Sequence, residues 1–226
     1  MNIKKHIPNS ITCGNLLCGC IGIVATFKGE LIFATYLLWL AIVLDFFDGF
    51  VARLLKVSSP IGKELDSLAD MVTFGVLPSV IMYHLITDYT DNAYLPYIGF
   101  VIAIFSALRL AKFNIDDRQT SVFIGLPTPA NALFISSLVF IAGSDYSSII
   151  NLTSLVIVSI GFSLLLVSPI ELFALKFKSF KWTDNKLRFT FLLLSVLLLG
   201  LFQVLAIPMI IIGYIVLSVI NNMISQ

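Results

Sequence analysis

Long runs of apolar residues, separated by short polar or charged stretches, recur along the whole chain. A helix of about 20 residues crosses a bilayer core of about 30 Å, so apolar runs of about 17–25 residues predict membrane-spanning helices. Eight such runs lie at approximately 8–28, 31–55, 63–87, 94–113, 128–143, 148–170, 187–204 and 207–224, of which the fifth is short. The pattern therefore predicts an all-α polytopic membrane protein with about eight transmembrane helices.

The last two runs form one apolar tract, 187–224, which would be roughly 57 Å long as a single helix. This length is nearly twice the thickness of the hydrocarbon core, so we expect the chain to fold back near residues 203–208. The longest polar stretch, 176–188, is expected to be a loop within the membrane domain. We therefore expect a single membrane domain over 1–226, with core spans at about 8–170 and additional spans at about 187–224.

The positive charges fall on alternate connections between the predicted helices. If the N-terminus is cytoplasmic, the cytoplasmic side carries Lys4, Lys5, Arg53, Lys56, Lys63, Arg109, Lys112, Arg118, Lys176, Lys178, Lys181, Lys186 and Arg188. Only Lys28 of the 14 cations lies outside. The positive-inside rule therefore predicts that both termini are cytoplasmic in a protein of the cell (inner) membrane. We also expect the first apolar run to be retained as a span and not removed as a signal peptide, because no small-residue cleavage site follows it.

Composition agrees with a membrane protein. Hydrophobic residues make up 58% of the chain, charged residues 12%, and the mean hydropathy is +1.00. A soluble domain has roughly 45–50% apolar and about 25% charged residues. These values exclude a disordered chain and a secreted disulfide scaffold. A net charge of +1 argues against nucleic acid as a partner, so the lipid bilayer is the expected surrounding.

Four aspartates stand at the ends of the second and third predicted helices. They belong to a spaced set of residues: Asp45, Asp48, Gly49, Ala52, Arg53, Gly62, Asp66 and Asp70. At about 100° per residue, the members before Arg53 share one face of the second helix, and those from Gly62 onward stack at i, i+4 and i+8 on the third. The connection 54–61 is short, so the two acidic faces can meet at the cytoplasmic end. An ionisable residue within a span costs at least a few kcal/mol and is by default a functional candidate.

Converging carboxylates repel one another strongly unless cations are present. An all-oxygen ligand set without nearby His or Cys favours magnesium, manganese or calcium over zinc. Four aspartates also suffice for a clamp of two metal ions, which typically serves displacement at phosphorus. The alternative is that the aspartates form salt bridges at the helix ends with Arg53, Lys56 and Lys63. That alternative does not require small residues to share the acidic face.

The spacing Asp-x2-Asp-Gly-x2-Ala-Arg-x8-Gly-x3-Asp-x3-Asp resembles the signature of the CDP-alcohol phosphotransferases at every fixed position. The resemblance implies a bundle with a cytoplasm-facing polar cavity, with two spans more than the family's core of six. It implies an enzyme that moves a phosphoalcohol from a CDP-alcohol to an acceptor hydroxyl and releases CMP. It also implies that two divalent cations, Mg²⁺ or Mn²⁺, are bound by Asp45, Asp48, Asp66 and Asp70, and that Asp70 is the general base.

The resemblance further implies which residues form the CDP site. These are Asp45, Asp48, Gly49, Ala52, Arg53 and Gly62. Asn9, Thr12 and Asn15 share a stripe on the first predicted helix that can face the nucleotide, so we add Asn9 and Thr12 to the expected CDP-binding residues. Local capping of the helix N-terminus is the alternative explanation of that stripe.

Three further segments, 7–15, 106–114 and 125–132, resemble bacterial and archaeal integral-membrane members of this family that use CDP-diacylglycerol and L-serine. This resemblance implies transfer of the phosphatidyl group to the serine hydroxyl, giving phosphatidylserine and CMP. Direct displacement needs no protein nucleophile, and the sequence offers no Ser/His or Cys/His pair near the acidic residues.

The carboxylate of a serine zwitterion favours a fork of hydrogen-bond donors. The expected acceptor-binding residues are Arg109, Lys112, Asn114 and Asn131. For Arg109 and Lys112 the alternative is membrane anchoring and attraction of phosphate. For Asn131 the alternative is polar packing at the start of a span.

Two rival functions stay open at this point. A sister enzyme would use glycerol 3-phosphate or an inositol phosphate as acceptor. A divalent-cation transporter would spread polar residues along the midplane and outer halves of several spans, whereas these carboxylates gather at one end. The sequence does not fix the number of subunits, and a homodimer is compatible with it.

Overall fold

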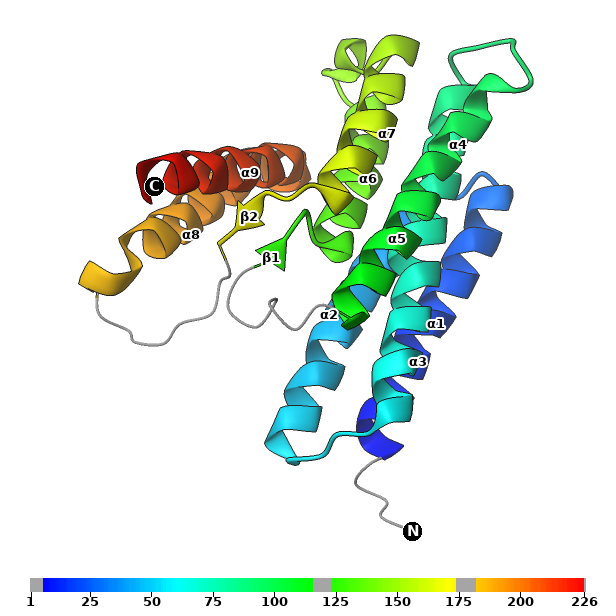
Figure 1. Ribbon diagram of the computed structural model, residues 1–226. Helices are drawn as coiled ribbons and strands as arrows, with labels where there is room; N and C mark the ends of the chain where they lie inside the picture. Colours follow the sequence, from blue (N-terminus) through cyan, green and yellow to red (C-terminus); the bar gives the residue numbers. More distant parts are fainter. Residues whose placement is uncertain (1–5, 116–122, 174–181, 226) are drawn as a thin grey trace.

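The computed structural model describes residues 6–115, 123–173 and 182–225 (Figure 1). The first part of the chain forms α1 (His6–Phe27), α2 (Leu31–Leu54), α3 (Pro60–Asp70), η2 (Met71–Val76), α4 (Leu77–Thr87), η3 (Leu95–Phe100) and α5 (Val101–Ile115). The second part forms β1 (Phe123–Ile124), α6 (Thr128–Ala142), η4 (Ser147–Ile149), α7 (Leu152–Val167), β2 (Glu171–Leu172), α8 (Trp182–Phe202), η5 (Gln203–Leu205) and α9 (Ala206–Ser225). The prediction of an all-α membrane protein is confirmed.

Five stretches of the described chain are long and apolar enough to cross a membrane. They are His6–Phe27, Leu31–Leu54, Pro60–Thr87, Leu95–Ile115 and Asn185–Ile224. The helices α6 and α7 are also apolar but have only 15 and 16 residues, or about 22–24 Å. Counting α8 and α9 separately, the described chain has eight apolar helical segments close to the eight predicted runs.

The bend between α8 and α9 lies where the length of the apolar tract required it. Gln203 has a φ of 51°, and η5 separates the two helices, which pack against each other (orange and red in Figure 1). The expectation of a loop over 176–188 is partly wrong. Residues 176–181 lie outside the described residues, but α8 already begins at Trp182 and contains a non-helical residue at Asn185. The Trp182 ring stacks on Phe189, with centroids 5.5 Å apart, and this contact supports the first turns.

The main core lies between α1, α2, α4 and α6. Its largest fully buried side chains include Leu38, Phe74, Leu77, Ile81 and Ile135. The start of α1 and the connection between α2 and α3 lie at the same end of the bundle (Figure 1). Both α2 and the continuation of α3 through η2 into α4 contribute to this core, so the segments that carry the aspartates are anchored in it.

One turn of the third span departs from the α-helix. Asp70 is followed directly by the π-helical turn η2, whose Thr73, Phe74 and Gly75 are buried. The hydroxyl of Thr73 donates a hydrogen bond to the backbone oxygen of Asn15, 3.2 Å away on α1. A single helix over 63–87 was expected from the sequence, which gave no sign of this turn. Such turns occur frequently at functional sites.

A pair of two-residue strands joins the start of α6 to the end of α7. The strands are antiparallel, with Phe123 opposite Leu172 and Ile124 opposite Glu171. The backbone N–H of Gly125 donates to the oxygen of Ile170 at 2.9 Å and extends the pairing. The sequence did not predict these strands, because two residues are too few to show an alternating pattern.

We expect Gly125→Ala to destabilise the protein by about 1–3 kcal/mol, because Gly125 has a φ of +77° and lies against α7. A Cβ at this position would come within 3.1 Å of the Leu166 carbonyl carbon. The thermal unfolding midpoint in detergent measures the effect. Gly161→Ala is the matched control, because a Cβ there meets nothing within 4 Å and alanine favours the helix. Equal midpoints for the two variants would contradict this explanation.

Candidate active site

The start of α3 is fixed by a local signal that places its acidic face. The side chain of Ser59 accepts a hydrogen bond from the Gly62 N–H at 3.1 Å, and Pro60 occupies the first turn. This is a favourable arrangement, because serine satisfies an unpaired N–H and proline has none to satisfy. Lys56, with a φ of 53°, turns the chain between the two helices. The helix α1 packs against both α2 and α3.

The structure brings the four aspartates together. Carboxylate oxygens of Asp45, Asp48 and Asp66 all lie within 4.8 Å of one another. Asp45 is also next to Asp70, so it joins the two aspartates of α3. Asp48 and Asp70 are buried, and the other two are half-buried. Carboxylates on two helices, 18 to 25 residues apart in the sequence, thus lie together between the membrane helices.

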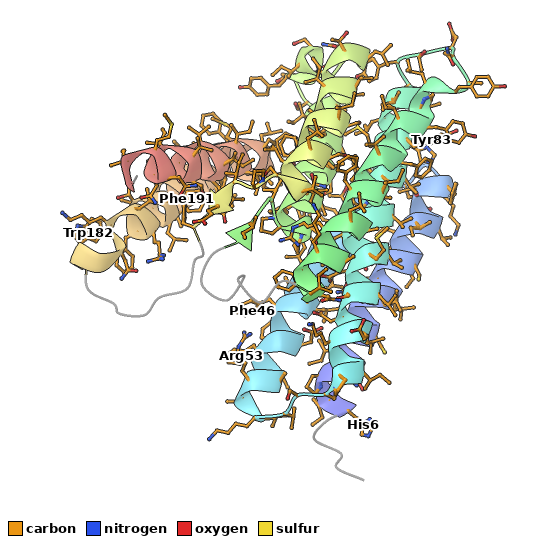
Figure 2. The ribbon with its side chains drawn as sticks, viewed as in Figure 1. His6, Phe46, Arg53, Tyr83, Trp182 and Phe191 are labelled. Atoms are coloured by element: carbon orange, nitrogen blue, oxygen red, sulfur yellow. The ribbon has the colours of Figure 1, made fainter. Side chains whose placement is uncertain are left out.

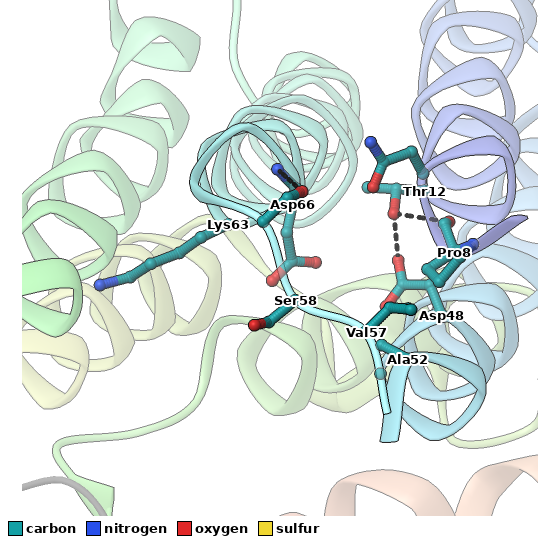
Figure 3. A pocket seen from close by; sticks show the side chains of 12 residues that line it. Pro8, Thr12, Asp48, Ala52, Val57, Ser58, Lys63 and Asp66 are labelled. Carbon is teal, nitrogen blue, oxygen red and sulfur yellow. Dashed lines mark hydrogen bonds between the residues drawn. The ribbon is translucent and has the colours of Figure 1, made fainter. Parts of the chain in front are cut away.

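The helix α1 supplies hydrogen-bond donors to this cluster. The hydroxyl of Thr12 donates to Oδ2 of Asp48 at 2.7 Å (Figure 3). The amide nitrogen of Asn15 donates to Oδ1 of Asp70 at 3.3 Å. One carboxylate on each of α2 and α3 is therefore held from a third helix.

A cavity of about 280 Å³ opens beside the aspartates. Its lining includes most of the residues expected to bind CDP: Asn9, Thr12, Asp48, Gly49, Ala52 and Gly62. Figure 3 shows Asp66 on α3 across the cavity from Asp48 on α2. The small residues leave room there, since a Cβ at Gly62 would lie 3.0 Å from Oδ1 of Asn9.

Two expected CDP-binding residues do not line this cavity. Asp45 lies behind it in the acidic cluster. Arg53 is exposed, its side chain extends outward from α2 (Figure 2), and its guanidinium would lie 3.4 Å from a Cβ at Gly49. The lining also contains residues that the sequence analysis missed: Pro8, Val57, Ser58, Ser59 and Lys63. The Ser-Ser-Pro sequence before α3 is a helix-start signal that could have indicated some of them.

The donor set fits a divalent cation. All the converging atoms are carboxylate oxygens, which hard cations prefer. Oδ1 of Asp66 is buried and has no hydrogen-bond partner among the described residues. A buried polar atom of this kind requires a partner, and a cation would provide one.

The salt-bridge alternative fits less well. Lys63 donates from Nζ to the backbone oxygen of Asn114 at 2.8 Å, and its side chain points away from Asp66 (Figure 3). Arg53 extends outward from α2, as described above. Within the described residues, these nearby cations are therefore directed elsewhere than into the cluster.

The structure separates the four expected acceptor-binding residues into two groups. Arg109 is 6% exposed, its Nε has no hydrogen-bond partner in the part of the chain that the structure describes, and its guanidinium is close enough to Asp70 to interact electrostatically. Asn131 is fully buried, and neither polar atom of its amide has a partner among the described residues. Lys112 is exposed. Asn114 exchanges hydrogen bonds with Ser67, at 2.9 and 3.2 Å.

The hydroxyls of Ser106 and Thr128 are also buried without a partner in the described structure. Each precedes one of the buried acceptor candidates by three residues and so shares its helix face. Neither residue was among the acceptor-binding residues expected from the sequence. Ser106 and Arg109 are on α5, and Thr128 and Asn131 are on α6. The two helices pack against each other and against η2.

Comparisons with known proteins agree with this site. Residues 5–167, from the start of α1 to the end of α7, match the family model described as CDP-alcohol phosphatidyltransferase. A Bacillus subtilis (strain 168) protein named CDP-diacylglycerol–serine O-phosphatidyltransferase is 39% identical over 171 residues, which are 74% of this chain and 89% of the relative. A Helicobacter pylori (strain J99) protein of the same name is 37% identical over 130 residues, 57% of this chain and 54% of the relative.

An archaetidylserine synthase of Methanothermobacter thermautotrophicus is 33% identical over 180 residues, 76% of this chain and 73% of the relative. The matched region contains the four aspartates, the cavity beside them and the buried polar residues of α5 and α6. Because the family model covers most of the chain together with this site, the protein belongs to the CDP-alcohol phosphatidyltransferase family.

Proposed function

We propose that the protein transfers the phosphatidyl group of CDP-diacylglycerol to the hydroxyl of L-serine, giving phosphatidylserine and CMP. The observation that carries this proposal is the meeting of four aspartates from two membrane helices beside a cavity lined by small residues. Membership of the family supports the class of reaction. The names of the Bacillus and Helicobacter relatives support serine as the acceptor.

In this proposal, Asp45, Asp48, Asp66 and Asp70 hold two divalent cations, Mg²⁺ or Mn²⁺. When bound, such ions supply positive charge to the diphosphate of the donor. The small residues Gly49, Ala52 and Gly62 leave space for the CDP moiety, and Asn9 and Thr12 line the same cavity. Arg53 would act from the rim of the site.

The proposed reaction is a single displacement at phosphorus. Asp70 takes the proton of the serine hydroxyl as the oxygen forms its bond to the phosphorus that carries diacylglycerol. The bond from that phosphorus to the oxygen of CMP breaks, and CMP leaves. No covalent enzyme intermediate is needed, so the carboxylate of Asp70 has only to lie within hydrogen-bond reach of the acceptor hydroxyl.

The position of Arg109 supports its role at the acceptor carboxylate. Its guanidinium is buried near Asp70, so a carboxylate bound by Arg109 would bring the adjoining hydroxyl toward the proposed base. The unpaired amide of Asn131 offers further hydrogen bonds. The exposure of Lys112 favours membrane anchoring for that residue, and the bonds of Asn114 to Ser67 favour a structural role there.

We further propose that the acidic end of the bundle faces the cytoplasm of a cell with the protein in its inner membrane. The distribution of Lys and Arg supports this orientation. We also propose that residues 1–226 form a single membrane domain. One buried apolar cluster supports it, because this cluster contains Leu126 just before α6 together with Phe191 of α8 and Tyr214 of α9.

A panel of acceptors tests the proposed function. The purified protein is incubated with CDP-diacylglycerol, a divalent cation and either L-serine, glycerol 3-phosphate or an inositol phosphate, and CMP release is measured. We expect CMP to be released when the acceptor is serine and not with the other two acceptors, and a chelator should abolish this release. Release with glycerol 3-phosphate but not with serine would assign the protein to the sister enzymes.

We expect Arg109→Ala to raise the KM for serine by about 10- to 150-fold, because a hydrogen bond to a charged group contributes about 1.5–3 kcal/mol. The KM for CDP-diacylglycerol should change little. Steady-state kinetics with each substrate varied in turn measures both. Arg109→Lys keeps the charge but loses the planar fork, so an intermediate KM is expected. An equal rise in both KM values would show that Arg109 serves the donor or the fold.

A further inference from the structure

Asn15 lies outside the spaced acidic set and yet contacts its last member. The side chain is fully buried in α1, and its amide nitrogen donates to Oδ1 of Asp70 at 3.3 Å. The amide oxygen of Asn15 is buried without a partner among the described residues. A buried amide with one bond to a carboxylate and one open acceptor is costly in an apolar bundle, so it calls for a functional explanation.

The place of Asn15 is fixed by the packing of α1 on the π-helical turn. The backbone oxygen of Asn15 accepts the hydroxyl hydrogen bond of Thr73. One turn further along α1, a Cβ at Gly19 would lie only 3.0 Å from the Cα of Thr73. The two backbones therefore approach each other closely, and this packing fixes the position of the Asn15 backbone.

Thr12 and Asn15 serve different aspartates. Thr12 binds Asp48, and both of these residues line the cavity proposed for CDP. Asn15 is absent from that lining and binds Asp70 instead. The sequence analysis placed both residues on one stripe that can face the nucleotide, whereas the structure directs Asn15 to Asp70, the aspartate that interacts electrostatically with Arg109.

We propose that Asn15 is a positioning residue for Asp70. Its N–H holds Oδ1, which limits rotation of the carboxylate and leaves Oδ2 to face the acceptor hydroxyl. An amide N–H can donate to a carboxylate but cannot take up a proton, so it orients the base without competing with it. This role rests on the proposed function, in which Asp70 accepts the proton of the acceptor.

Asn15→Leu tests the proposal, because leucine has a similar size and no donor. We expect kcat and the single-turnover rate to fall by about 10- to 100-fold, the usual effect of removing a residue that orients a functional group. Metal-dependent binding of CDP-diacylglycerol, and its KM, should stay within about threefold of the wild type. Asn15→Asp keeps the shape of the side chain but replaces the donor nitrogen by an oxygen, so its turnover should fall at least as far. This second variant tests the proposal if Asn15→Leu does not insert into the membrane.

Two comparisons make the result specific. Thr26→Val is the matched control, because Thr26 is a fully buried polar residue of the same helix whose hydroxyl donates to the backbone oxygen of Ile23. Thr12→Val should weaken donor binding, in contrast to Asn15→Leu. Wild-type turnover in Asn15→Leu would overturn the proposal, and so would a loss of donor binding as large as the loss of rate. CMP release by the wild-type protein with serine tests the proposed function separately, because its absence would contradict that function whatever the variants do.

Discussion

Asp66→Asn is expected to abolish CMP release while the protein still inserts and purifies normally. Asp66 lies within 4.8 Å of Asp45 and Asp48, lines the cavity, and holds a buried oxygen that has no partner in the described structure. It is therefore one of the carboxylates that would hold divalent cations in this cluster. An asparagine keeps the size of the side chain but removes a negative charge on which both ions would depend.

The measurement is CMP release at ordinary magnesium or manganese concentrations, together with the thermal unfolding midpoint. Glu64→Gln is the matched control, since it removes one negative charge from an exposed position of the same helix. This control should keep nearly full activity. Near-normal release by Asp66→Asn would rule out the assignment of Asp66 as a metal ligand.

Asp70→Asn should lower phosphatidyl transfer by about 10²–10⁴-fold, the range typical of a lost general base. Asparagine keeps one oxygen that can bind a metal ion but cannot accept the serine proton. Binding of CDP-diacylglycerol in the presence of metal should therefore survive. Single-turnover rates and direct binding measurements on the same preparation separate the two effects.

Asp45→Asn provides the comparison for Asp70. Asp45 lies close to both aspartates of α3, so its loss should weaken the metal sites and with them the binding of the donor. If Asp70→Asn loses donor binding as completely as Asp45→Asn, then Asp70 is chiefly a metal ligand. The proton would then leave through water or another acceptor.

The acceptor residues show where prediction from the sequence reached its limit. Arg109 and Lys112 were equivalent in the sequence, since both are cations at the end of one predicted span. In the structure Arg109 is buried near Asp70 and contacts the ring of Phe113, 5.8 Å from its centroid, while Lys112 is exposed. Residues three apart on a helix point only about 60° away from each other, so the helical pattern does not separate Arg109 from Lys112. Only the packing of the neighbouring helices decides which of the two side chains is buried.

The sequence predicted the cavity-lining residues that lie on helices better than those in the connection between α2 and α3. Gly49, Ala52 and Gly62 were expected to line it and do so, because helical spacing fixes their common face. Ser58 and Ser59 were not expected, since the spacer before Gly62 carries no periodic pattern. Arg53 was expected at the CDP site but extends outward, because a long charged side chain at a helix end can reach water.

The sequence by itself determined that the chain crosses a membrane and that α2 and α3 each present an acidic face. These are local properties, because apolar length and helical spacing are set by residues within one segment. Only the tertiary structure decided that Thr12 and Asn15 reach aspartates 36 and 55 residues away, and that the π-helical turn follows Asp70. Those contacts depend on how closely α1 packs against two other helices, which no single helical pattern encodes.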